Sequence, residues 1–214
     1  QVIIPIIISV IVVIVVVTME NAEFRIPVQR VAIHSIYADK NYMAIKLNPI
    51  GVMPVMFSSA VFMLLQMIVS VISIYFPNAG VIQWITANMN LNEIFGIIIY
   101  IGVLYFLTIM MAMVFISPKD LTEQFLKSGD SIVGIHAGDD TYHYLRRIIL
   151  TTSIISSTVM GACILIPMLF QYYGAMDSSL AVLPSSFMML TGMFNNLMQE
   201  VIAVRNFDEY RPFI

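Results

Sequence analysis

Residues 2–19 read VIIPIIISVIVVIVVVTM, an uncharged run rich in Ile and Val. By intrinsic propensity, β-branched residues favour a strand, so the run could be a buried strand. In lipid, however, an unpaired backbone group costs several kcal/mol, and only a helix pairs its own backbone groups within one segment. About 20 mostly apolar residues are enough to cross roughly 30 Å of hydrocarbon. The run therefore predicts a membrane-spanning helix if the rest of the chain belongs to a membrane protein.

The composition of the whole chain indicates a membrane protein. Of its 214 residues, 59% are apolar and 11% are charged, and the mean hydropathy is +0.90. A soluble domain has about 25% charged and about 45–50% apolar residues. The high hydropathy, the net charge of −3 and the single cysteine, Cys163, exclude a disordered chain, a nucleic-acid binder and a disulfide-stapled module. We expect a polytopic membrane protein.

Uncharged windows then predict an all-α fold with five transmembrane helices. The spans are expected at about 2–19, 49–75, 94–116, 148–170 and 180–202. The turn at 77–80 separates the second span from a polar-tinged loop that contains Trp84. Trp84 suits a membrane interface, where its amphipathic ring is favoured.

The positions of the ten basic residues predict the topology. They lie in a first loop (about 20–46), a second loop (about 117–147) and a tail (203–214), and the other two connections contain none: Arg25, Arg30, Lys40 and Lys46; Lys119, Lys127, Arg146 and Arg147; Arg205 and Arg211. Cytoplasmic loops collect Lys and Arg, so the chain is expected to start outside and end in the cytoplasm. A start outside the membrane at Gln1 predicts the C-terminal part of a longer membrane protein; a complete five-span protein is the alternative.

The second loop has clear local signals. Ser117, Pro118 and Asp120 form a helix start, and the helix is expected over 119–127 with its end at Gly129. An apolar tip follows, formed by Ile132, Val133 and Ile135. A partner could cover this tip, or the tip could fold back on its own helices. In the first loop, Pro27 favours an extended stretch before it.

Polar and small residues within the spans leave further alternatives. Ser153, Ser157 and Gly161 are spaced for static helix packing. Asn195, Asn196 and Gln199 near the end of the fifth span fit either a water-lined path or a bond between helices.

Short motifs occur in order along the whole chain: EFRIPVQ at 23–29, LNPIGVMP at 47–54 followed by FSS at 57–59, SPKD at 117–120, GIHAG at 134–138 with Thr141, and Glu209-Tyr210. Together they resemble segments of the SecY family of protein-conducting channels. The resemblance implies ten spans in two inverted halves, of which this chain would be spans six to ten, and the topology inferred from charge agrees with that half.

The resemblance also implies a function. Such a channel conducts unfolded preproteins across the bacterial plasma membrane and releases apolar segments into membrane lipid. It is not an enzyme and needs no cofactor, metal or nucleic acid. A SecA-type motor ATPase or a ribosome would drive the preprotein through the channel. A small SecE-like subunit and accessory Sec proteins are the other implied partners.

The resemblance assigns residues to each part of such a channel. Met56 and Met189 match positions of the apolar pore ring. Asn48, Ser58 and Ser59 match the wall of the lateral gate. The motor-docking loops would contain Arg25, Arg30, Lys119, Lys127, Ile135, His136, Arg146 and Arg147.

Two residues depart from the family pattern. His136 stands where the family usually has Arg, so a fixed cation is lost near pH 7, and Ala137 replaces the usual Pro. With the methionine pore positions, this resembles the accessory branch of the family in Gram-positive bacteria, which exports serine-rich glycosylated adhesins with its own accessory SecA. The alternatives are a housekeeping SecY and, more remotely, half of a solute transporter. An intramembrane enzyme is disfavoured because all three histidines lie in the loops and the expected spans carry no acid except Glu200 at one end.

Overall fold

The computed structural model describes residues 3–30, 42–77, 79–91, 93–136, 138–173 and 178–210. At residues 30, 178–179, 203 and 206–210 it describes the backbone alone. The helices are α1 (Ile3–Asn21), α2 (Met53–Tyr75), α3 (Gly80–Asn88), α4 (Ile94–Phe115), α5 (Pro118–Ser128), α6 (Asp139–Tyr172) and α7 (Ser178–Tyr210). The strands are β1 (Glu23–Arg30), β2 (Tyr42–Lys46) and β3 (Asp130–Ile132).

The expected mostly helical membrane fold is confirmed. In the described part of the chain, four helical stretches are long and apolar enough to cross a membrane: Ile3–Asn21, Met53–Tyr75, Ile94–Ser128 and Asp139–Tyr172. The fifth expected window lies within α7. The Val- and Ile-rich run at the start of the chain is helix α1, so the backbone's need for internal hydrogen bonds outweighs its β propensity.

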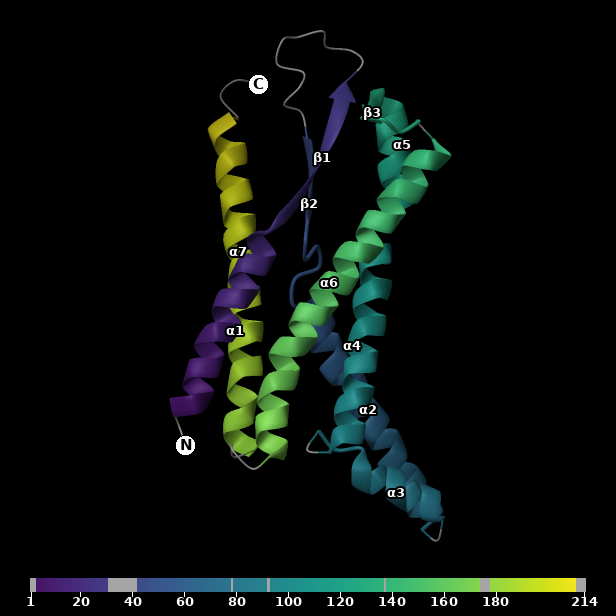
Figure 1. Ribbon diagram of the computed structural model, residues 1–214, viewed down its shortest axis with the longest axis vertical. Coiled ribbons are helices and arrows are strands. Elements are labelled where there is room, and N and C mark those ends of the chain that lie inside the picture. The colour runs from purple at the N-terminus through teal and green to yellow at the C-terminus, as the bar shows by residue number, and fades with distance from the viewer. Residues whose placement is uncertain are drawn as a thin grey trace.

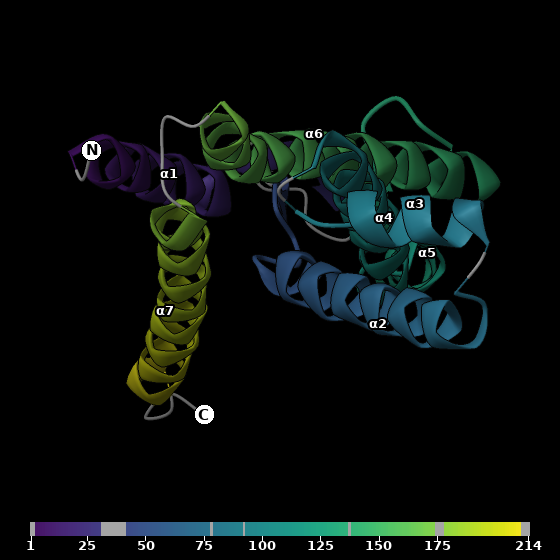
Figure 2. The ribbon, with the colours of Figure 1, turned by 90° about the horizontal axis from the view of Figure 1, so that it is seen from below.

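Helix α6 is the centre of the bundle. It runs diagonally between the pair α1 and α7, which pack side by side, and α4, which carries α2 on its flank (Figure 1). Seen from below, α2 and α7 lie on the same side of α6 (Figure 2). Helix α7 packs against α1 and α6, whereas α2 packs against α4 and α3, so α2 and α7 contact different neighbours on that side.

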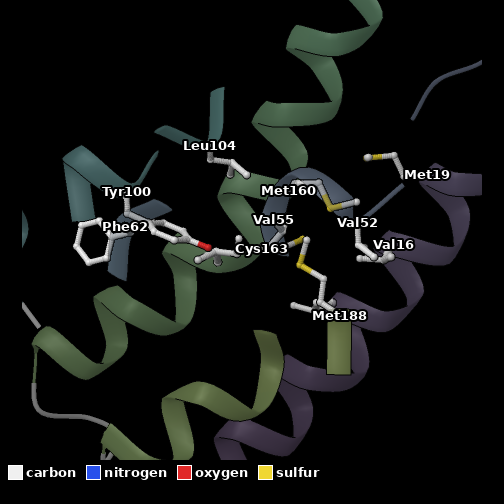
Figure 3. Packing of buried hydrophobic residues seen from close by; sticks show 12 residues of the cluster. Val16, Met19, Val52, Val55, Phe62, Tyr100, Leu104, Met160, Cys163 and Met188 are labelled. Carbon is white, nitrogen blue, oxygen red and sulfur yellow. The ribbon is translucent and has the colours of Figure 1, made fainter. Parts of the chain in front are cut away.

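Side chains from five helices form the main core (Figure 3). Phe62 of α2 meets Tyr100 of α4 edge-on, with ring centroids 5.7 Å apart. Small residues of α6 lie against its neighbours: Ser153 and Ser157 are buried, and Gly161 lies next to Leu104 and Tyr105 of α4. This burial supports static helix packing for the three small residues of α6.

A small antiparallel sheet lies at one end of the molecule and joins the two loops. Its strand order is β2-β1-β3, with Glu23 opposite Lys46 and Val28 opposite Ile132. The extended stretch expected before Pro27 is present in β1, which continues to Arg30, but the sequence did not predict the sheet. Ile132 is 3% exposed and packs into the sheet core, whereas Val133 is 47% exposed. The apolar tip thus folds back in part and exposes the remainder.

Helix α5 begins and ends as the sequence predicts, within one residue at each end. The Ser117 hydroxyl accepts a hydrogen bond from the Asp120 backbone N–H at 3.3 Å, and Pro118 occupies the first turn. Gly129 ends the helix in the left-handed conformation, with φ of 69°. Helix α5 follows α4 and precedes β3 in the chain, and it packs against β3 and α6.

Candidate functional site

A partly buried polar cluster lies where α1, β2 and α7 meet. Glu20, at the last turn of α1, is 3% exposed, and its Oε2 accepts a hydrogen bond from Asn195 Nδ2 of α7 at 2.5 Å. Lys46, the last residue of β2, donates from Nζ to Gln199 Oε1 of α7. These two bonds attach α7 both to a helix and to the sheet.

Close backbone contacts accompany these hydrogen bonds. A Cβ added to Gly192 of α7 would lie 2.4 and 2.5 Å from the two methyl groups of Val52. Gly51 has φ of +69°, and a Cβ there would lie 3.0 Å from Asn196 Nδ2. The glycines therefore allow α7 to pass directly against the turn that precedes α2.

A cavity of about 400 Å³ adjoins the cluster. Its lining includes Glu20, Lys46, Asn48, Asn196 and Gln199. Asn48 is 4% exposed and its Oδ1 accepts a hydrogen bond from Ser156 of α6 at 3.0 Å. Glu20 Oε1 and Asn48 Nδ2 have no hydrogen-bond partner among the described residues. The cluster is thus a polar junction in which two buried polar atoms have no hydrogen-bond partner among the described residues.

The polar residues of α7 divide between the two alternatives left open by the sequence. Asn195 forms a hydrogen bond between helices, whereas Asn196 and Gln199 line the cavity. Sequence reasoning missed Glu20, which it placed in the first loop rather than in α1. Its contact with Asn195 lies 175 residues away along the chain, so no local pattern could reveal it.

The two expected pore residues lie on α2 and α7, which are on the same side of α6 (Figure 2). Met56 of α2 and Met189 of α7 are both half-buried. Met189 packs against the main core, and its neighbour Met188 is fully buried. The pore role of both methionines stays a prediction.

The expected gate residues occupy two different positions. Ser58 and Ser59 are in α2, where each hydroxyl donates to a carbonyl of its own helix, Pro54 O at 2.6 Å and Met56 O at 2.7 Å. Asn48 is outside α2, in the turn before it, and contacts α6. The gate role stays a prediction.

The expected docking residues gather around the sheet end of the molecule. Arg25, Lys119, Lys127, Arg146 and Arg147 are exposed. Arg25 lies over the ring of Tyr42, 4.7 Å from its centroid, and Lys127 pairs with Glu123 at 3.6 Å. The side chain of Arg30 is outside the described residues.

Ile135 and His136 lie side by side in the second loop and differ in exposure. His136 is exposed, and its carbonyl accepts a hydrogen bond from Thr141 Oγ1 at 2.9 Å. Ile135 is half-buried and packs against the sheet core. His136 is therefore the more accessible of the two. A groove of about 350 Å³ lies nearby between α5 and the start of α6, with Lys119, Glu123 and Tyr142 among its lining residues.

No group of three or more His, Cys, Asp or Glu side chains that could hold a metal ion occurs in the described ranges. Long apolar helices in one bundle, with a charged sheet end and a polar junction beneath it, define a polytopic helical membrane protein. The SecY family model matches residues 1–202, and the chain belongs to the SecY family.

Curated relatives carry a more specific name. The chain is 29% identical over 92% of its length to the accessory Sec system protein translocase subunit SecY2 of Streptococcus pneumoniae serotype 4, and it covers 48% of that relative. It is 30% identical over 91% of its length to the protein of the same name from Streptococcus agalactiae serotype Ia, and it covers 47% of it. The chain thus spans about half the length of the curated relatives it matches.

A solved structure titled "The structure of a protein conducting channel" has a similar fold. The TM-score is 0.53 at 20% sequence identity, and the match covers 92% of this chain and 49% of that chain. This similarity supports the fold described above.

Proposed function

We propose that this chain forms the C-terminal half, spans six to ten, of a SecY-type channel that conducts unfolded preproteins across the plasma membrane. The observation that carries the proposal is the family match over residues 1–202, together with relatives named accessory SecY2 that are twice as long. We assign the chain to the accessory Sec system, and its cargo to serine-rich glycosylated surface proteins.

In this proposal the channel wall includes α2 and α7. Met56 and Met189 contribute to an apolar ring around the passing chain, because a flexible thioether side chain can seal against side chains of different shapes. Ser58 and Ser59 allow α2 to part from a helix of the other half, because small hydroxyl-bearing residues bind weakly between helices. The channel itself performs no chemical reaction.

The sheet end is the proposed docking surface for a SecA-type motor. It carries the exposed cations of both loops, and the sheet holds the two loops together. Lys and Arg mark the cytoplasmic side of membrane proteins, so the sheet end lies in the cytoplasm and residues near Gln1 lie outside. A small SecE-like subunit would complete the channel.

Co-purification tests this proposal. The chain, expressed within its full-length protein and extracted in mild detergent, should bring down a SecA-type ATPase. A strain that lacks the gene should lose export of its serine-rich surface protein and keep general secretion. If general secretion fails instead, the housekeeping role is correct; if both persist and no motor co-purifies, the channel proposal is wrong.

A further inference from the structure

Helix α3 lies at the end of the molecule opposite the sheet (Figure 1). It follows α2 and precedes α4, and none of its nine residues is buried. Val81 is 72% exposed and Trp84 is 54% exposed. Large apolar side chains exposed to water are unfavourable, so we ask what covers the surface of α3.

Two contacts hold α3 to its neighbours. Gln66 Nε2, in α2, donates to the carbonyl of Met89 just after α3 at 2.7 Å. The ring of Trp84 meets the ring of Phe95 in α4 at a centroid distance of 5.0 Å and an interplanar angle of 61°. Helix α3 therefore links α2 to α4, and the side chains of Val81, Gln83, Trp84 and Ala87 stay exposed.

The surroundings of α3 in the sequence carry no charge. No Asp, Glu, Lys or Arg occurs between Lys46 and Glu93. Tyr75 and Phe76 before α3 are 76% and 62% exposed, and Ile94 after it is 49% exposed. Helix α3 thus lies in the chain between two helices that expose apolar side chains at their adjoining ends and are long and apolar enough to span a membrane.

Trp84 indicates the depth of this surface. Its ring is half exposed and meets Phe95 on one side. Trp concentrates at the boundary between acyl chains and headgroups, where the ring is in an apolar environment and the N–H reaches water or a lipid carbonyl. A lipid surface supplies both environments at once.

We propose that α3 lies in the headgroup region of the bilayer, with Val81 and Trp84 inserted at the acyl boundary. Its occupant is lipid, not a protein partner. Through the Gln66–Met89 hydrogen bond, α3 anchors this end of α2 to the bilayer and to α4. Because α2 is the proposed gate helix, the anchor would restrict gate movement to the other end of α2.

Tryptophan fluorescence tests the location of α3. Trp84 is the only tryptophan of this chain, so subtracting the signal of the Trp84→Phe variant isolates its emission even in the full-length protein. The protein is reconstituted into vesicles that contain phospholipid brominated near either the carbonyl or the methyl end of the acyl chain. Iodide in the buffer serves as the water-phase quencher.

Two reference probes calibrate the result, both in the Trp84→Phe background. Phe106→Trp replaces a side chain of α4 that is 63% exposed, and Leu126→Trp replaces a side chain of α5 that is 54% exposed. We expect the methyl-end bromine to quench Phe106→Trp most strongly and iodide to quench Leu126→Trp most strongly. Trp84 should be quenched more by the carbonyl-end bromine than by either of the others.

Two results would overturn the proposal. Strong iodide quenching of Trp84 without bromolipid quenching would place α3 in water, and protection from all quenchers would mean that a protein covers it. The measurement does not depend on translocation, so either result leaves the proposed channel function standing.

Discussion

At the scale of single residues, Gly192 determines how closely α7 approaches the start of α2. In Gly192→Ala, the new methyl group would collide with both methyl groups of Val52 at 2.4 and 2.5 Å. We expect a loss of about 1–3 kcal/mol, as for other overpacked sites. The midpoint of thermal unfolding in detergent measures this loss.

The double variant Gly192→Ala/Val52→Ala should recover part of the loss because it removes the colliding methyl groups. Gly102→Ala is the matched control, since a Cβ there has no heavy atom within 4 Å. Equal midpoints for all three variants would show that α7 does not pack against Val52.

The carboxylate of Glu20 accepts one hydrogen bond, from Asn195, and lies close enough to Lys46 to interact with its charge. Asn195→Ala removes the donor to Oε2, and Oε1 already has no partner in the described residues. An unsatisfied buried group costs about 1–3 kcal/mol, and more when charged, so this variant should be clearly destabilised. Combining it with Glu20→Gln, which removes the negative charge, should restore part of the stability. A double-mutant cycle on the unfolding midpoint measures the coupling, and additive effects would contradict a direct Glu20–Asn195 bond.

At the scale of elements, α5 presents an exposed ion pair on the proposed docking surface. Lys127→Glu should weaken binding of a SecA-type ATPase in a pull-down, because it reverses a charge on that surface. The same change also breaks the pair with Glu123. The swapped variant Glu123→Lys/Lys127→Glu restores the pair and keeps the net charge.

The swap separates local structure from recognition. If binding depends on net charge or on the pair, the swapped variant should bind as well as the unaltered protein. If it depends on the cation at position 127, the swapped variant stays weak. Full binding by both variants would move the docking surface away from α5.

The elements differ in how far the sequence predicts them. Helix α5 follows from Ser117, Pro118 and Gly129, because its caps are local signals. The apolar helices follow from the absence of charge over long windows. Strand β3 has three residues and owes its pairing to β1, which lies far away in the chain, so no local pattern marks it.

The candidate sites show the same division. Met56, Met189 and the loop cations could be named in advance because a family resemblance supplies a role for individual positions. Glu20 and Gly192 could not, since their importance arises from contacts between α1, α2 and α7 that exist only in the packed bundle. Tertiary contacts between distant segments are what the sequence alone does not reveal.

At the scale of the whole molecule, the proposed pore ring makes a prediction about leakage. Met56→Asn and Met189→Asn replace an apolar side chain with an amide on two helices, α2 and α7, that lie on the same side of α6. If these residues seal the channel, both variants should export substrates with defective signals. Met110→Asn, on an exposed site of α4, is the control. An unchanged export phenotype for both pore variants would count against their role in the seal.

The topology inferred from charge also concerns the whole molecule. In a Cys163→Ser background, Ala87→Cys marks the end of α3 and Gln124→Cys marks α5; both positions are exposed. A membrane-impermeant thiol reagent applied to intact cells should label Ala87→Cys only, and lysis should make Gln124→Cys reactive. Labelling in the reverse order would invert the topology.

The strand order β2-β1-β3 has a consequence for the order of events during synthesis. Strand β1 can pair with β2 as soon as the first loop leaves the ribosome, but its other edge faces Ile132, which is made only after α2 and α4. Until then the nascent chain carries an open strand edge, which can pair with another chain and aggregate. Completion of the sheet therefore reports that the intervening helices have been synthesised and have brought the second loop back to the first.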